Sequence, residues 1–252
     1  MNEILQVATF AGQIVLENGG ETYRVEETIW RICKAFGAEE AESFVTPTGI
    51  MASICHNGQT YSLIKRVSTR TVDLDKIDLV NDLSRNIILK NLSVKDFKIE
   101  LQNINKGIRY STTITLIFSA LGAAGFAILF GGDMKDFLAA FIIGFIIKLL
   151  TIKGSELQIN QFFINSLSAA VAAFLAIILV NINIASNLDQ TIIGSIMLLV
   201  PGLAITNAIR DTIAGDLLSG LTRAAEAFLV AISIAVGSGA VLSFWISNWG
   251  GI

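Results

Sequence analysis

The stretch LLVPGLAITNAIRDTIAGDLLSGLTR, residues 198–223, decides how the fold of this chain is interpreted. It begins as an apolar helix, meets Pro201-Gly202, and then carries four charged side chains, although the sequence on both sides is apolar. Proline removes a backbone donor, and the freed carbonyl groups need partners inside a bilayer. Such a break is tolerated where it is buried in protein or lines a water-filled cavity. The sequence therefore predicts a kinked membrane helix that brings charged groups to a polar site.

The distribution of charge divides the chain into two parts. Residues 1–110 contain 13 Lys or Arg and 14 Asp or Glu, whereas residues 111–252 contain only 5 and 7. The whole chain is 53% hydrophobic and 15% charged, while a soluble domain usually has about a quarter of its residues charged. We therefore expect a soluble domain at residues 1–110 and a transmembrane domain at residues 111–252.

Five apolar stretches in the second part are candidates to cross a membrane, because a hydrocarbon core of ~30 Å needs about 20 helical residues. The predicted spans are Thr112–Phe130, Phe137–Leu150, Gln161–Val180, Thr191–Ile209 and Ala224–Ile246. The second is short and could extend to Asp136 and Lys153 if these side chains reach toward the interface. The predicted fold class is a membrane all-α bundle of five transmembrane helices preceded by a small cytosolic α+β domain.

The positions of Lys and Arg predict the orientation, because cytoplasmic loops carry an excess of both. One side would hold eight of these cations, namely Lys95, Lys98, Lys106, Arg109, Lys148, Lys153, Arg210 and Arg223. Of these, Lys148 and Lys153 are expected in the loop between the second and third spans. The other side would hold only Lys135. We expect a multi-pass membrane protein, with its N-terminus in the cytoplasm and its C-terminus outside.

The first 110 residues carry both helix and strand signals. Helical periodicity covers residues 3–18, 25–36, 75–91 and 94–106. The strand-like segments Ile50–His56 and Gln59–Arg66 are joined by Asn57-Gly58, which is the strongest short signal for a β-hairpin. The sequence therefore predicts an α+β domain with a small sheet.

This soluble part offers little enzyme chemistry. Its only histidine, His56, follows Cys55, and consecutive residues of a strand point to opposite faces. The sequence contains no phosphate loop, zinc-ligand spacing or GxSxG motif. We predict no catalytic residue, metal ion, cofactor or nucleic-acid partner, although a membrane-anchored cytosolic enzyme stays as an alternative.

The polar residues after the predicted helix break are the candidates for substrate binding or proton coupling. They are Asn207, Arg210, Asp211, Asp216, Arg223 and Glu226, with Pro201 and Gly202 as the break itself. Asn207 and Asp211 are four residues apart and so share a helical face. A plain cytosolic loop would also explain the charges, but it would not explain a Pro-Gly pair inside a span.

Three stretches resemble the threonine/serine exporter family. They are GGETYRVEETIWRICKAFG at 19–37, VTPTGI at 45–50 and PGLAITNAIRDTIAGDLLSGLTRAAEA at 201–227. The resemblance implies an inner-membrane exporter of threonine and serine or, in a two-subunit form, of dicarboxylates such as succinate. In the first two stretches it covers Gly19, Gly20, Tyr23, Arg24, Glu26, Pro47 and Thr48, for which we expect structural roles as helix stop, turn and docking surface.

The resemblance also implies that this chain is one half of a split exporter, because single-chain members carry about twice the spans predicted here. A smaller membrane subunit or a second copy of the chain would supply the rest. Two halves of opposite orientation place a substrate site at their interface near the membrane midplane. The expected partners are therefore a small-molecule substrate, such a subunit and the lipid bilayer. A non-transporting assembly or sensor subunit is the other alternative.

Overall fold

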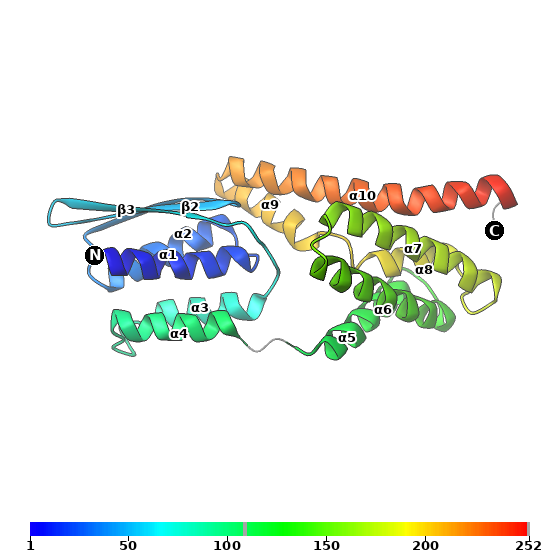
Figure 1. Cartoon of the computed structure of the whole chain (residues 1–252), viewed down its shortest axis with the longest axis horizontal. Coiled ribbons are helices and arrows are strands. Elements are labelled where there is room, and N and C mark those ends of the chain that lie inside the picture. Colours follow the sequence, from blue (N-terminus) through cyan, green and yellow to red (C-terminus); the bar gives the residue numbers. More distant parts are fainter. Residues whose placement is uncertain (108–109, 251–252) are drawn as a thin grey trace. The chain divides into compact units, whose positions relative to one another are not determined.

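The computed structural model describes residues 1–107 and 110–250, apart from the side chain of Trp249, and it divides into two compact units (Figure 1). Unit 1 comprises Met1–Ile108 and Gly202–Ala225, and unit 2 comprises Arg109–Pro201 and Glu226–Ile252. The segment Gly202–Ala225 therefore packs with the N-terminal part of the chain, although it lies within the second of the two domains expected from composition. Arg109, which contributed to the expected orientation, lies outside the described residues.

Unit 1 contains a three-stranded sheet and several helices. In chain order these are α1 (Asn2–Glu17), α2 (Thr22–Ala35), β1 (Glu40–Thr46), β2 (Gly49–His56), β3 (Gln59–Arg66), α3 (Leu74–Arg85), α4 (Val94–Lys106), α9 (Gly202–Ala214) and the start of α10 (Leu217–Trp249). The hairpin at Asn57-Gly58 is confirmed. Strand β1 was not predicted, because the glutamates at its start hide the alternation of apolar and polar residues in the sequence. Helix α3 ends at Arg85, whereas the prediction extended it to residue 91.

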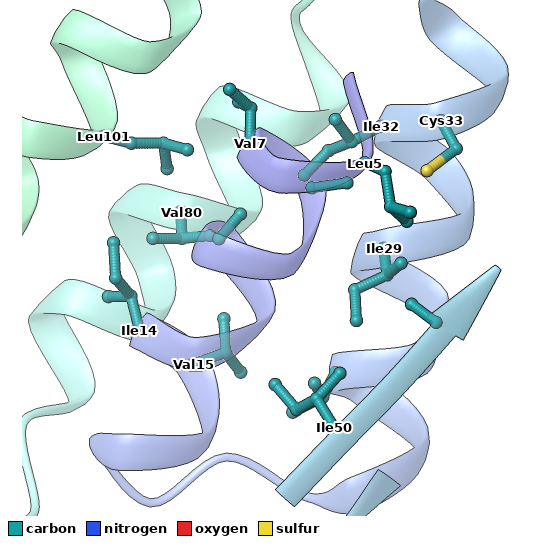
Figure 2. Close-up of a cluster of buried hydrophobic side chains, with 14 of the residues drawn as sticks. Leu5, Val7, Ile14, Val15, Ile29, Ile32, Cys33, Ile50, Val80 and Leu101 are labelled. Atoms are coloured by element: carbon teal, nitrogen blue, oxygen red, sulfur yellow. The ribbon is translucent and has the colours of Figure 1, made fainter. Parts of the chain in front are cut away.

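The sheet is antiparallel, in the order β1-β2-β3, and it buries one face. Val45, Ile50, Ala52 and Ile54 point to that face and pack on α1 and α2. Helices α3 and α4 contact the other side of α1, so unit 1 has three layers (Figure 1). Figure 2 shows the resulting core, in which Ile14 and Val15 of α1 lie among side chains of the neighbouring helices and of β2.

The Gly19-Gly20 pair turns the chain sharply between α1 and α2. Gly19 has φ +97°, a conformation that side-chain-bearing residues rarely adopt. A Cβ on Gly20 would lie 2.9 Å from the carbonyl oxygen of Val15. Both positions therefore require glycine, and the turn leaves their carbonyl groups at the start of α2.

Unit 2 contains the apolar helices. They are α5 (Thr112–Leu129), α6 (Met134–Glu156), α7 (Gln161–Asn181), the short α8 (Leu188–Ile196) and the rest of α10. Four helices of the described chain are long and apolar enough to cross a membrane, namely Thr112–Leu129, Met134–Glu156, Gln161–Asn181 and Leu217–Asn248. They correspond to four of the five predicted spans.

The predicted span Thr191–Ile209 is not one helix. Helix α8 ends at Ile196, a series of turns follows, and α9 begins at Gly202, directly after Pro201. The predicted helix break at Pro201-Gly202 is therefore present, because the proline cannot supply a helical hydrogen bond, whereas the fourth of the five predicted spans is not among the helices long enough to cross a membrane. The prediction that Lys148 and Lys153 lie in a loop is wrong, since both belong to α6.

A buried carboxylate fixes the N-terminus of α8 within unit 2. Asp136 of α6 is fully buried and accepts hydrogen bonds from the backbone N–H groups of Ser186 and Asn187 at 2.9 and 2.8 Å. The side chains of Asn187 and Thr191 also donate to it. The N-cap residue Asn187 makes no side-chain capping bond, so Asp136 caps α8 from another helix.

Gly194 sets how closely α8 approaches α5. A Cβ at this position would lie 2.6 Å from the backbone nitrogen of Ala127, whereas one on Gly125 of α5 would meet nothing within 4 Å. We therefore expect Gly194→Ala to push the helices apart and to destabilise the protein by about 1–3 kcal/mol, the usual cost of overpacking. Gly125→Ala is the matched control. Thermal unfolding midpoints in detergent should fall only for Gly194→Ala, and equal midpoints would contradict the packing argument.

Candidate functional site

Helix α9 buries its polar face and exposes its apolar face. Asn207 and Asp211 are buried, whereas Ile205, Ile209 and Ile213 are exposed. The three isoleucines are four residues apart and follow one side of the helix. A surface helix of a soluble protein has the opposite arrangement. The buried polar groups of α9 must therefore find partners inside unit 1.

Asp211 caps helix α2. Its carboxylate accepts hydrogen bonds from the backbone N–H and the hydroxyl group of Thr22, each at 3.1 Å. Thr22 is the first residue of α2, and the N-cap residue Glu21 makes no side-chain capping bond of its own. The first N–H groups of a helix have no partner within the helix, and a carboxylate there also interacts favourably with the helix dipole. The cap thus comes from a residue 189 positions away in the sequence.

Arg223 of α10 balances this buried charge. Its Nε lies 3.0 Å from Oδ2 of Asp211, and the two side chains are only 6% and 0% exposed. The Nη2 group of Arg223 donates a hydrogen bond to the carbonyl oxygen of Gly20 at 2.8 Å. The side-chain amide of Asn207 donates one to the carbonyl oxygen of Gly19, also at 2.8 Å. The two glycine carbonyls therefore bind α9 and α10 to the start of α2.

Glu21 forms ion pairs with two further cations. It forms ion pairs with Arg210 of α9 and, at 2.9 Å, with Arg24 of α2. Burial raises the pKa of Glu21, but hydrogen bonds and the two guanidinium groups outweigh this effect and leave its pKa below the ordinary value. The side chain of Arg210 is 54% exposed. Arg210 is therefore the cation of this group that solvent reaches most readily.

We call these paired residues the turn cluster. It consists of Gly19, Gly20, Glu21, Thr22, Arg24, Asn207, Arg210, Asp211 and Arg223. Four of the six residues singled out in the third stretch thus lie in one place. Glu21 and Thr22 were not named as candidates, although the quoted GGETYR sequence contains both. The sequence did contain a signal for their involvement, because α2 starts directly after a glycine pair without a residue that usually caps a helix.

The remaining acids lie beside the turn cluster or outside it. Burial and the nearby charge of Asp211 raise the pKa of Asp216, which is half-buried. Burial also raises the pKa of Glu26, and the charges of Asp216 and Asp211 add to this, although a hydrogen bond from Val45 opposes it. Glu226 is half-buried and belongs to unit 2.

The VTPTGI stretch joins the same region. The backbone N–H of Val45 donates to Glu26 at 2.9 Å, and the carbonyl of Val45 accepts from the hydroxyl of Ser219 at 3.4 Å. Pro47 is buried and Thr48 is exposed, with its carbonyl accepting from the N–H of Val67. All three stretches that carry the family resemblance therefore meet within unit 1.

No group of His, Cys, Asp and Glu in the described part of the chain is arranged to hold a metal ion. Cys33 is buried, and burial raises the pKa of its thiol to about 12, so it is not a reactive thiolate. The chemistry that the turn cluster offers is the binding of charged or hydrogen-bonding groups.

The described chain thus combines apolar helices of membrane-spanning length with a cluster of charged residues that can bind polar groups, which are features of a membrane protein that handles polar solutes. The chain matches the family described as "Putative threonine/serine exporter" (ThrE) over residues 6–245, and it belongs to this family. Members of the family are transporters, which agrees with the absence of catalytic residues from our predictions.

Two curated relatives extend over nearly the whole chain. Both are called "Probable succinate transporter subunit YjjP". The protein from Klebsiella aerogenes is 26% identical over 241 residues, which cover 93% of this chain and 92% of the relative. The protein from Escherichia coli (strain K12) is 25% identical over 246 residues, covering 94% and 93%. No solved structure matches the chain at a significant level.

Removing Asp211 should destabilise unit 1. The variant Asp211→Ala leaves Arg223 buried without its ion pair and α2 without its cap, a change that typically costs about 3–5 kcal/mol. Asp216→Ala is the control, because it removes an acid whose charge is disfavoured there. Thermal unfolding and limited proteolysis should both detect the difference. The double variant Asp211→Ala/Arg223→Ala should lose less than the sum of the two single changes, and strict additivity would argue against the pair.

Glu26 should make stability depend on pH. The pKa of Glu26 in the folded protein lies above the ordinary value of 4.5. The protein therefore loses folding stability as the pH rises through the window between the ordinary pKa and the raised, folded-state pKa. Glu26→Gln keeps an acceptor oxygen for Val45 and cannot ionise. The stability of Glu26→Gln relative to the parent should therefore increase with pH through the window and stay constant above it. Unfolding midpoints across a pH series measure this, with Asp216→Asn expected to change in the same direction. A relative stability that falls with pH would be the contrary result.

Proposed function

We propose that this chain is the inner-membrane subunit of an exporter of small polar metabolites, either threonine and serine or a dicarboxylate such as succinate, and that it acts with a second membrane subunit. Membership of the exporter family supports export. The relatives' printed name, a succinate transporter subunit, supports a dicarboxylate and a multi-subunit assembly.

The observation that carries the proposal is the attachment of Gly202–Ala225 to the N-terminal part of unit 1. Because residues of both segments are hydrogen-bonded to one another, they lie on the same side of the membrane. The chain between them must then cross an even number of times. Helices α5, α6 and α7 supply three crossings. We infer a fourth crossing between Asn181 and Gly202, in the segment that contains α8.

Helix α10 then leaves unit 1 and makes the fifth crossing, so the C-terminus lies on the opposite side. The Lys and Arg distribution favours a cytoplasmic unit 1, because most of the cations belong to it. The C-terminus is then outside. This argument supports the expected topology even though the fourth crossing is discontinuous.

A discontinuous crossing is typical of transporters. Unwound backbone at membrane depth is tolerated where it lines a cavity, and half-helix ends bind substrates and ions. The backbone between Ile196 and Gly202 lies outside both α8 and α9, which supports this comparison. We propose that it contributes to the pathway through which the substrate leaves, with Pro201 and Gly202 forming the break.

The polar residues of α9 and α10 are the proposed substrate and proton sites. Arg210 is the best candidate to bind a substrate carboxylate, since it is half-exposed and its present partner, Glu21, is itself a carboxylate. A substrate carboxylate could replace Glu21 at the same guanidinium group. Asn207, Asp211 and Arg223 would position this group, and Asp216 or Glu226 would take a proton or pair with an ammonium group.

A second function is favoured by a different observation. The Asp211–Arg223 pair is buried and internally satisfied, as expected of a residue pair that fixes structure. A non-transporting assembly subunit would need no more than this. Reconstitution separates the two roles, because flux that requires the chain but survives loss of Arg210 would favour the assembly role.

Efflux measurements test the proposed site. Cells expressing Arg210→Ala should export labelled threonine, serine or succinate at a rate reduced by about tenfold or more, the change expected when a charged hydrogen-bond partner of a substrate is removed. Arg85→Ala is the control, because it removes an arginine of unit 1 outside the turn cluster. Normal efflux by Arg210→Ala, at normal protein abundance, would remove Arg210 from the site.

A further inference from the structure

Lys148 is a cation in the interior of a helix that is long and apolar enough to cross a membrane. Helix α6 extends over Met134–Glu156, about 35 Å at 1.5 Å per residue, and Lys148 lies about 12 Å from its Glu156 end. The residues on both sides, FII at 145–147 and LL at 149–150, are apolar. Ionisable side chains within spans are rare because they are costly to desolvate, and they usually mark the path of a substrate or an ion.

The ammonium group of Lys148 forms no hydrogen bond or ion pair within the described part of the chain. The two acids of α6 are already engaged. Glu156 pairs with Lys153 at 2.8 Å, and Asp136 accepts the N–H groups at the start of α8. A charge in a span is stable only when something pairs with it, so the partner of Lys148 is expected to be a group from outside these residues.

Lys148 does not lie on the outer face of α6. That face carries apolar side chains that are 36–58% exposed, namely Leu138, Ile142, Phe145 and Leu149. Lys148 is half-buried and follows the buried Gly144 by four residues, so it lies above Gly144 on the flank of the helix. A lysine that only extended through lipid toward the interface would belong to the exposed face. Its position favours contact with the neighbouring segments of unit 2.

The end of the broken crossing lies along the same flank of α6. The hydroxyl of Thr191 donates to Asp136, and Leu198 lies beside Gly144, where a Cβ would be 3.4 Å from its Cδ1. Helix α8 and the residues after it therefore follow α6 in the same direction. The chain reaches the level of Lys148 at about Pro201, and both segments belong to unit 2.

The break supplies hydrogen-bond acceptors near this cation. Pro201 has no N–H, so the carbonyl of Met197, four residues earlier, cannot receive a helical hydrogen bond from it. Residues 197–201 lie outside both α8 and α9. An ammonium group binds a carboxylate, and unwound backbone carbonyls accept from cationic groups. The two features together match the chemistry of a small carboxylic acid or an α-amino acid.

We propose that Lys148 binds a carboxylate group of the exported molecule inside the membrane, beside the break at Pro201. Its ammonium group neutralises the carboxylate when the molecule leaves water. The carbonyl groups of residues 197–200 accept hydrogen bonds from the ammonium group when the molecule is an amino acid. This inference rests on the proposed function for the identity of the ligand, and it adds a binding residue in unit 2 to the one proposed at Arg210.

Efflux from cells with matched variants provides the first test. Lys148→Met keeps an unbranched side chain and removes the charge, so it should reduce the efflux of labelled succinate, threonine or serine by about tenfold or more. Lys153→Met is the matched control, because it removes a cation from the exposed side of the same helix and should leave efflux unchanged. Lys148→Arg keeps the charge and should retain part of the efflux. Equal efflux by the parent and Lys148→Met, at equal abundance, would overturn the proposal.

Thermal unfolding of the full chain in detergent separates ligand binding from a structural role. Removing an unpaired cation should leave the unfolding midpoint of Lys148→Met equal to that of the parent or higher. Succinate, threonine or serine should raise the midpoint of the parent and of Lys153→Met, because a ligand that binds only the folded state stabilises it. The same molecule should not raise the midpoint of Lys148→Met. A lower midpoint of Lys148→Met without ligand would instead assign Lys148 a structural role.

The two measurements distinguish this inference from the proposed function. Absence of efflux from cells with the parent chain would contradict the proposed function, whereas a ligand-induced shift that depends on Lys148 would still support the site. Normal efflux that survives Lys148→Met would contradict the site alone. A parent midpoint that none of the three molecules raises, or an equal shift in Lys148→Met, would also refute the site.

Discussion

The buried pair between Asp211 and Arg223 is the interaction on which the remaining architecture depends. Asp211 supplies the cap that α2 lacks, and Arg223 neutralises it while binding the Gly20 carbonyl. Neither charge could be buried alone, because the desolvation cost of an isolated ion is several kcal/mol. The pair therefore requires α2, α9 and α10 to assemble together. It also makes Gly202–Ala225 part of unit 1, although more than 90 residues separate the two segments in the sequence.

This attachment explains why α9 has an apolar outer face. A helix that turns its polar side toward its own protein leaves isoleucines outside, and the surrounding phase or another protein must cover them. It also constrains how often the chain crosses the membrane. Two segments bonded on one side allow only an even number of crossings between them, and for this reason the proposed topology includes a fourth crossing through the segment with α8.

The same physical device occurs twice in the molecule. In unit 1, Asp211 caps α2 from another helix, and in unit 2, Asp136 caps α8 from α6. In both cases a carboxylate that looks out of place in an apolar sequence satisfies the orphan N–H groups of a helix. An acid near a predicted span is therefore a structural element as readily as a transport site. Arg210 differs from both carboxylates because its guanidinium group stays half-exposed.

The sequence by itself determined the apolar helices, the Asn57-Gly58 hairpin and the position of the helix break, because each depends on local periodicity or on the backbone properties of Pro and Gly. It also carried the family resemblance. Only the tertiary structure decided that Asn207, Asp211 and Arg223 bind the turn at Gly19-Gly20, and that β1 completes the sheet. These features depend on hydrogen bonds and ion pairs between distant segments, and no local pattern specifies which donor will meet which acceptor.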